Sequence, residues 1–211
     1  MKYENAQEAF EHLYASINDN GIEFGDTKTF FNHGFYIKNP LDNEINTDFR
    51  KWNKDYAEFE WQWYLSADPN GEEISKRASI WKNHMDEDGN IRSNYGWQWN
   101  RNDQLHKIID KLRQNEFTRQ AVLSIYDGKE IGTYGFDTPC TNSIHFQVVN
   151  NELCMTVNMR SNDLWFGFCN DQYCFSKLQW LVAKELRLNC GWYYHFASNL
   201  HLYNKHLISN Q

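Results

Sequence analysis

The sequence predicts a single α+β domain over residues 1–211, in which a mixed β-sheet is flanked by helices. Two observations carry this prediction. Helical and strand-like periodicities follow one another without the regular alternation that a doubly wound parallel sheet requires. The 3 prolines and 11 glycines are scattered along the chain, and neither a linker rich in Ser, Gly or Pro nor an internal repeat divides it.

Apolar spacing assigns the elements in order. Phe10, Leu13, Tyr14 and Ile17 recur at helical intervals and predict an amphipathic helix over residues 6–17. Residues 25–29 (GDTKT) predict a loop, and residues 29–38 a strand. Further helices are expected from an N-cap region at 46–48 to about 65, over 103–112 and over 173–186, and further strands over 121–126 and 192–197.

The clearest β signal lies between residues 144 and 159. Apolar and polar residues alternate on both sides of Asn150-Asn151, a pair that suits a tight turn. This segment is therefore predicted to be a β-hairpin.

Composition excludes several classes of protein. No apolar run approaches the roughly 20 residues that span a bilayer, and the first residues lack the pattern of a secretory signal, so we expect a cytoplasmic protein without a membrane partner. The net charge of −7 argues against a general nucleic-acid binder. The 5 cysteines are an odd number and none lies in a CxxC pair, so neither disulfides nor a metal site is expected.

Common phosphate-loop, dinucleotide, zinc-protease and hydrolase motifs are absent. What remains is a series of segments: EWQWYL from Glu60, NYGWQW from residue 94, TRQ from residue 118, TPCT around Cys140, RSND from Arg160, and His201-Leu202-Tyr203. In order and spacing this series resembles the thymidylate synthase family. The resemblance spans most of the chain and implies that family's fold, a nucleotide substrate, 5,10-methylenetetrahydrofolate as cosubstrate, and a homodimer.

The resemblance makes Cys140 the nucleophile. A thiolate that adds to carbon 6 of a pyrimidine makes carbon 5 nucleophilic. The resemblance places Arg160 close by, where its charge would lower the pKa of the thiol. The alternative is that Cys140 is a buried structural thiol.

Phosphate binding is expected from Arg160, with a hydroxyl hydrogen bond from Ser161. The family uses a second arginine pair from the partner subunit, but here only Arg119 stands at that place, because Gln120 replaces its neighbour. Lys28 is a candidate for the missing positive charge. Exposed ion pairing is the alternative for both Arg119 and Lys28. If Arg119 serves the partner's site, the protein must be a homodimer.

The resemblance assigns the sugar 3′-hydroxyl to His201 and Tyr203, although both could simply pack at a strand end. Glu60 lies among aromatic residues, where burial would raise its pKa and suit it to move protons; otherwise it is an exposed helical glutamate. Tyr95 and Trp81 are expected to line the nucleotide and folate cavity, with ordinary core packing as the alternative.

The choice of base depends on Asp171, which stands where thymidylate synthases have asparagine. A carboxyl group can accept from the 4-amino group of cytosine and, if protonated, donate to N3. Asp171 therefore indicates cytosine. Two alternatives remain: Asp171 caps the following helix, or a shift of one residue puts Asn170 at the discriminating place.

Thr141 follows Cys140 where the synthases have histidine, and MRSND and FGF resemble the phage deoxycytidylate hydroxymethylases. That likeness implies transfer of a one-carbon unit to carbon 5 of dCMP and capture of water, held by Glu60, Asp171 and Thr141, to give 5-hydroxymethyl-dCMP for modified DNA in the host cytoplasm. The few residues after Tyr203 imply that folate is enclosed differently from the synthases. The alternatives are a thymidylate synthase or dUMP hydroxymethylase, and a catalytically inactive nucleotide-binding protein.

Overall fold

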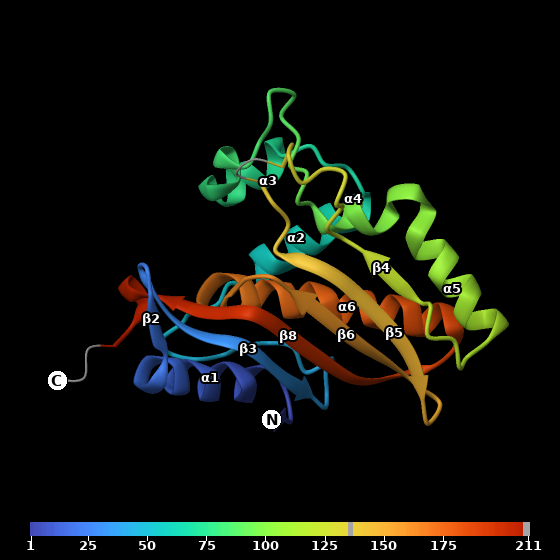
Figure 1. Ribbon diagram of the computed structural model, residues 1–211, viewed down its shortest axis with the longest axis horizontal. Coiled ribbons are helices and arrows are strands. Elements are labelled where there is room, and N and C mark those ends of the chain that lie inside the picture. Colours follow the sequence, from blue (N-terminus) through green and yellow to red (C-terminus); the bar gives the residue numbers. More distant parts are fainter. Residues whose placement is uncertain (135–136, 209–211) are drawn as a thin grey trace.

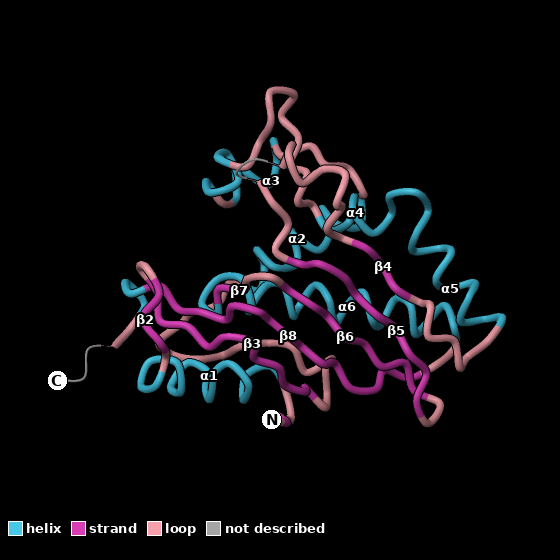
Figure 2. The backbone as a smooth tube through the Cα atoms, in the orientation of Figure 1, coloured by secondary structure: helices cyan, strands magenta, loops and turns pink. Residues whose placement is uncertain are grey.

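The computed structural model describes residues 1–134 and 137–208, and its strands form one mixed sheet (Figures 1 and 2). The strand order is β1-β3-β8-β6-β5-β4, with β2 paired to β3 and β7 paired to β8. The strands are β1 (Lys2–Tyr3), β2 (Ile22–Phe24), β3 (Thr27–Ile37), β4 (Val122–Ser124), β5 (Thr141–Val149), β6 (Glu152–Met159), β7 (Asn162–Asp163) and β8 (Asn189–Tyr203). β1–β3, β6–β8 and β7–β8 are parallel pairs and the others are antiparallel, so the predicted mixed sheet is confirmed.

Six α-helices accompany the sheet within the described residues. They are α1 (Ala6–Asn20), α2 (Lys54–Ser66), α3 (Glu72–Arg77), α4 (Tyr95–Asn100), α5 (Gln104–Gln114) and α6 (Cys169–Leu186). Three short 3₁₀ turns, η1 (Ser79–Asn83), η2 (Arg101–Asp103) and η4 (Asn204–His206), and one π-helical turn, η3 (Leu164–Phe168), complete them. The α+β fold class is thereby confirmed.

The first helix forms as its sequence predicts. Asn5 caps α1 by accepting a hydrogen bond from the Glu8 amide, and Phe10, Leu13 and Ile17 are fully buried. A side chain that satisfies one of the first four amides stabilises a helix by about 1 kcal/mol. The helix extends past the predicted Ile17 to Asn20, where Gly21 ends it.

The predicted hairpin is confirmed as β5 and β6. Asn150 and Asn151 have φ of 53° and 61°, the left-handed conformation that a two-residue type I′ turn requires and that asparagine tolerates. On β6, Met155, Val157 and Met159 are fully buried, whereas Thr156 and Asn158 between them are only partly buried. One face of the sheet therefore contributes to the core.

Several predicted boundaries were wrong. The segment 25–29 is not a loop throughout, because β3 begins at Thr27 and pairs with β2. The aromatic helix begins at Lys54, not near residue 46, because Asn53 supplies the cap and accepts from the Tyr56 amide. The strand predicted over 192–197 runs from Asn189 to Tyr203, since its whole length pairs with β3 and β6.

The remaining predictions differ by a few residues. The helix expected over 103–112 is Gln104–Gln114, and the strand expected over 121–126 is Val122–Ser124. The helix expected over 173–186 begins at Cys169, directly after the π-helical turn η3.

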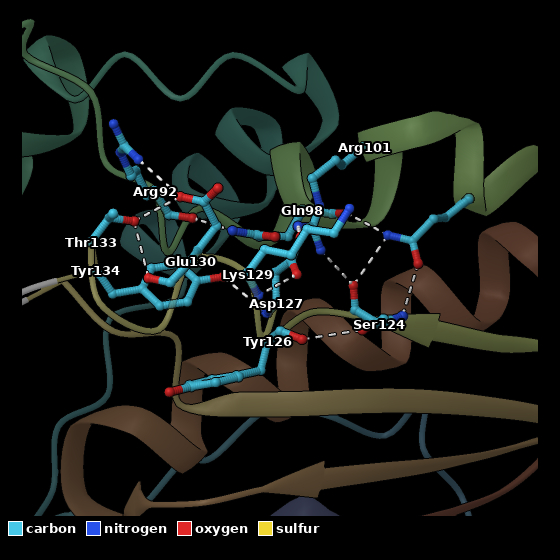
Figure 3. A network of polar contacts seen from close by, with 11 residues as sticks. Arg92, Gln98, Arg101, Ser124, Tyr126, Asp127, Lys129, Glu130, Thr133 and Tyr134 are labelled. Atoms are coloured by element: carbon cyan, nitrogen blue, oxygen red, sulfur yellow. Dashed lines mark hydrogen bonds and ion pairs between the residues drawn. The ribbon is translucent and has the colours of Figure 1, made fainter.

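A network of ion pairs and hydrogen bonds ties the chain before β5 to the helices above the sheet (Figure 3). Arg101 pairs with Asp127, and Arg92 contacts Glu130 at 3.2 Å. The Thr133 hydroxyl donates to Glu130 at 2.7 Å. The chain that approaches Cys140 is thus attached to the α4–α5 region through several side chains.

Candidate active site

A cavity of about 250 Å³ opens between α2, the segment 80–95, the segment 137–140 and the turn that leads into α6. Seven of the residues predicted for the site line this cavity: Glu60, Trp81, Tyr95, Cys140, Ser161, Asn170 and Asp171. The structure thus brings together side chains that are up to 111 positions apart in the chain.

A larger open groove of about 530 Å³ lies elsewhere, between the end of α5 and residues Val148, Leu186 and Leu188. No cysteine and no buried carboxyl group is among its lining residues. Chemistry therefore favours the smaller cavity as the candidate active site.

Cys140 lies directly before β5, where the pairing with β6 shifts register between Thr141 and Ser143. Such a bulge redirects the strand end. Arg160, directly after β6, holds this segment: its amide donates to the Cys140 carbonyl at 2.8 Å, its Nε to the Pro139 carbonyl at 3.0 Å, and its Nη2 to the Thr138 carbonyl at 2.9 Å. The Nη2 of Arg160 also lies 3.8 Å from the Cys140 Sγ.

The resting thiol is protonated at neutral pH. Burial raises the pKa of Cys140 to about 11, and the charge of Arg160 lowers it only in part, while Asp171 raises it further. The expected effect of Arg160 is present, but burial outweighs it.

Glu60 and Asp171 form a pair of carboxyl groups in the cavity wall. Glu60, on α2, is 5% exposed, and burial raises its pKa to about 7, as its aromatic surroundings predict. Burial also raises the pKa of Asp171, and the nearby Glu60 raises it further. Glu60 is therefore able to exchange a proton near neutral pH, as acid–base chemistry requires, and the environment of Asp171 favours its uncharged form.

The structure excludes one alternative for Asp171, that it caps the following helix. The helix α6 begins without a side-chain cap, and Asp171 accepts instead from Asn162 Nδ2 at 2.8 Å. Asn170 also lines the cavity, but its Oδ1 accepts from the Trp52 indole at 2.8 Å.

The aromatic wall is connected to Glu60. The Trp81 indole donates to the Tyr56 hydroxyl at 2.8 Å, and that hydroxyl donates to Glu60 Oε1 at 3.3 Å. Tyr95, at the start of α4, lines the cavity beside Glu60 and Cys140. Both predicted aromatic residues face the cavity, and their contact with a ligand stays a prediction.

Like Arg160, three further predicted residues lie next to the cavity and do not line it. Thr141 is fully buried and is not among the residues that line the cavity, so the structure does not bring it to the surface where water would be held. His201 lies opposite Asp163 in the β7–β8 pairing. Tyr203 follows on the same strand, and its ring packs against the His201 ring with centroids 5.2 Å apart.

The two additional cations lie away from this cavity. The Lys28 ammonium donates to the Asn18 carbonyl at 2.6 Å, near the end of α1, so the structure does not place it as a phosphate ligand. Arg119 is exposed in the segment before β4 and does not line the cavity of its own chain.

The sequence interpretation missed several residues of the cavity wall. Asp137 accepts from the Ser93 amide at 2.9 Å and lies 3.1 Å from the Nδ1 of His84. Asn162 contacts Asp171 and also lines the cavity. Adjacency to Cys140 and Arg160 was the available signal for Asp137 and Asn162, but no signal connected His84 or Ser93 to the site.

Within residues 1–134 and 137–208, neither a metal site nor a membrane-spanning helix is found. No cluster of three or more His, Cys, Asp or Glu side chains suitable for a metal ion occurs among them. No helix in those ranges is long and apolar enough to cross a membrane.

Comparison with known proteins identifies relatives of this chain. A family model described as thymidylate synthase matches residues 9–211. A deoxyuridylate hydroxymethyltransferase of Pseudomonas phage M6 is 32% identical over 68% of this chain and 42% of its own length. A thymidylate synthase of Mycoplasma pneumoniae is 30% identical over 81% of this chain and 59% of its own length. The chain thus spans about half the length of these curated relatives.

Proposed function

Because this chain belongs to the thymidylate synthase family, we propose that it transfers a one-carbon unit from 5,10-methylenetetrahydrofolate to carbon 5 of dCMP. The product is 5-hydroxymethyl-dCMP, which would supply the synthesis of modified DNA. The observation that carries this proposal is Asp171, a carboxyl group in the wall of the cavity that also contains Cys140.

The base is selected by hydrogen-bond pattern. Cytosine offers a 4-amino donor and an N3 acceptor, and a neutral carboxyl group offers one acceptor and one donor in return. Burial and the neighbouring Glu60 raise the pKa of Asp171, which favours that neutral form. A mismatched base would leave buried polar groups unpaired, at about 1–3 kcal/mol each.

The proposed reaction uses the residues as follows. The Cys140 sulfur adds to carbon 6, and the electron pair displaced from the 5,6 double bond makes carbon 5 nucleophilic toward the one-carbon unit. Loss of the carbon 5 proton and of tetrahydrofolate gives an exocyclic methylene. Water adds to that carbon, and the sulfur leaves carbon 6. Glu60, with a pKa of about 7, is positioned to exchange the protons of these steps.

The nucleotide would be held on both sides of the reacting carbon. Arg160 and Ser161 would bind its phosphate, and His201 and Tyr203 its sugar hydroxyl. We infer that Arg119 of a second copy completes the phosphate site, so that the active form is a homodimer. Mixing inactive Cys140→Ser and Arg119→Ala chains should restore activity in the mixed dimers; no recovery would contradict the shared site.

A single incubation tests the function. The purified protein is given methylenetetrahydrofolate with equal dCMP and dUMP, and the nucleotide products are identified by mass spectrometry. We expect 5-hydroxymethyl-dCMP, and Asp171→Asn should shift the preference toward dUMP. Thymidylate would overturn the water-capture step, and the absence of any product would favour a nucleotide-binding protein without activity.

A second candidate is hydroxymethylation of dUMP. It is favoured by the phage relative, whose name gives deoxyuridylate as its substrate. The same incubation distinguishes the two candidates, because 5-hydroxymethyl-dUMP would overturn the role given to Asp171 and leave that of Cys140 intact.

A further inference from the structure

A chain of buried polar side chains reaches Asp171 from the sheet. On β8 the Tyr193 hydroxyl lies 2.7 Å from His195 Nδ1, and His195 Nε2 lies 3.1 Å from Asn162 Oδ1 on β7. Asn162 Nδ2 then contacts Asp171 Oδ2 at 2.8 Å. Tyr193 and His195 are fully buried and Asn162 is 2% exposed. The proposed reaction gives no role to the first three of these side chains.

Each hydrogen bond in this chain has a definite direction. The Asn162 amide nitrogen donates to Asp171, so its oxygen faces His195 and must accept. Burial lowers the pKa of His195 to about 3, so the ring is neutral and carries its single proton on Nε2. The Nδ1 of His195 therefore accepts from the Tyr193 hydroxyl. The donors point in one direction, from Tyr193 toward Asp171.

The direction of these hydrogen bonds matters because a neutral carboxyl group can pair with either cytosine or uracil. With the proton on the oxygen that faces N3, it pairs with cytosine; with the proton on the oxygen that faces position 4, it pairs with uracil. A free carboxyl group exchanges these two arrangements by moving its proton. A donor fixed on Oδ2 makes that oxygen an acceptor and leaves the proton to Oδ1.

Resting on the proposed function, we propose that Asn162, oriented by His195, is a specificity-determining residue that fixes which oxygen of Asp171 carries the proton. The two act as positioning residues, through Asp171. With cytosine bound, Oδ2 of Asp171 faces the 4-amino group of the base, and the protonated Oδ1 donates to N3. A uracil in the same place would meet an acceptor with its carbonyl and a donor with its N3 hydrogen.

Gly167 keeps room for this contact. A Cβ atom at this position would lie 3.1 Å from Asn162 Nδ2 and 3.3 Å from Asp171 Oδ2, closer than most such contacts. The turn that carries Gly167 thus packs directly on the Asn162–Asp171 hydrogen bond. The arrangement is built from three elements: β7, η3 and α6.

The test compares discrimination between two nucleotides. The ratio of kcat/KM for dCMP to that for dUMP is measured in the natural protein and in Asn162→Leu, and the ratio of the two dissociation constants is measured alongside, so that turnover is not required. We expect both ratios to move toward one by at least tenfold in the variant. Gln179→Leu is the matched control, because Gln179 is a fully buried amide farther along α6 whose hydrogen bonds within the described ranges go to backbone carbonyls. The ratios of this control should not change.

Variants of His195 separate orientation from packing. His195→Leu should reduce discrimination as Asn162→Leu does, and His195→Gln, which keeps a donor and an acceptor, should restore it. Should His195→Leu fail to fold, Tyr193→Phe, which removes one oxygen atom, should give a smaller loss of the same kind.

The outcomes distinguish this inference from the proposed function. If Asn162→Leu lowers binding and turnover of both nucleotides by the same factor, its role is merely structural and the inference is overturned. If the natural protein prefers dUMP, the proposed function fails, while a loss of discrimination in Asn162→Leu would still support the role of Asn162.

Discussion

Replacing Glu60 with glutamine tests the electrostatics of the cavity most directly. A glutamate whose pKa rises from 4.5 to about 7 on folding retains its proton in the folded state over that interval, while the unfolded chain has lost it. Below about pH 4.5 Glu60 is protonated in both states, and the protein has the full stability that this group allows. As the pH rises toward 7, the unfolded chain releases the proton and the folded protein keeps it, so the free energy of unfolding falls. Each pKa unit corresponds to about 1.4 kcal/mol, so the loss amounts to ~3 kcal/mol.

Glu60→Gln removes this pH dependence and nearly keeps the shape of the protonated side chain. The free energy of unfolding of both proteins is measured with urea between pH 5 and 8.5. Relative to the natural protein, that of the variant should rise by about 2–3 kcal/mol across this range. Glu58→Gln is the matched control on the same helix. Despite partial burial, hydrogen bonds and the ion pair with Lys177 lower the pKa of Glu58, so its variant should lose stability relative to the natural protein at neutral pH. A difference between natural protein and Glu60→Gln that is constant with pH would refute the reasoning.

Four further predictions follow from individual contacts. Cys140→Ser should abolish product formation yet keep dCMP binding in calorimetry; residual turnover would remove Cys140 as nucleophile. Alkylation of Cys140 by iodoacetamide, followed by mass spectrometry, should be slow at pH 7 and accelerate toward pH 11. Arg160→Leu should slow the alkylation further at any given pH. A plateau of the alkylation rate near pH 8 would contradict the burial argument. Gly167→Ala should weaken dCMP binding about tenfold in calorimetry, because its methyl group crowds Asn162; unchanged affinity would show that the turn yields. Asn53→Ala should cost about 1 kcal/mol in urea unfolding by removing the α2 cap, and no loss would show that water replaces it.

The sequence predicted the fold where local signals agree with tertiary packing. Helix α1 and the β5–β6 hairpin carry both a clear periodicity and their own terminating residues, so their existence was predictable. The length of β8 was not, because residues 198–203 alternate poorly and are held in the strand by pairing with β3 and β7. Likewise, the start of α2 depends on which of two asparagines, Asn46 or Asn53, serves as the cap.

Residues of the candidate site that belong to sequence motifs could be predicted. Residues that reach the site only through the folding of the chain could not. Cys140, Glu60 and Asp171 stand in recognisable segments and meet in one cavity. The role of His195 could not be predicted, because a histidine within the aromatic run of residues 192–196 has the pattern of an ordinary core residue. The charge of Lys28 suited the predicted role, but its ammonium group donates to the Asn18 carbonyl, and a contact with phosphate stays a prediction.

The protonated state of Cys140 has a consequence for chemical damage and for inhibition. Oxidants such as peroxide and simple electrophiles attack thiolates far faster than thiols, so a buried thiol with a pKa of about 11 resists both while the cavity is empty. Reactivity would then be conferred by the nucleotide itself. Compounds that first occupy the proposed nucleotide site and only then present an electrophilic carbon should capture Cys140, whereas reagents chosen for thiol reactivity alone should spare it.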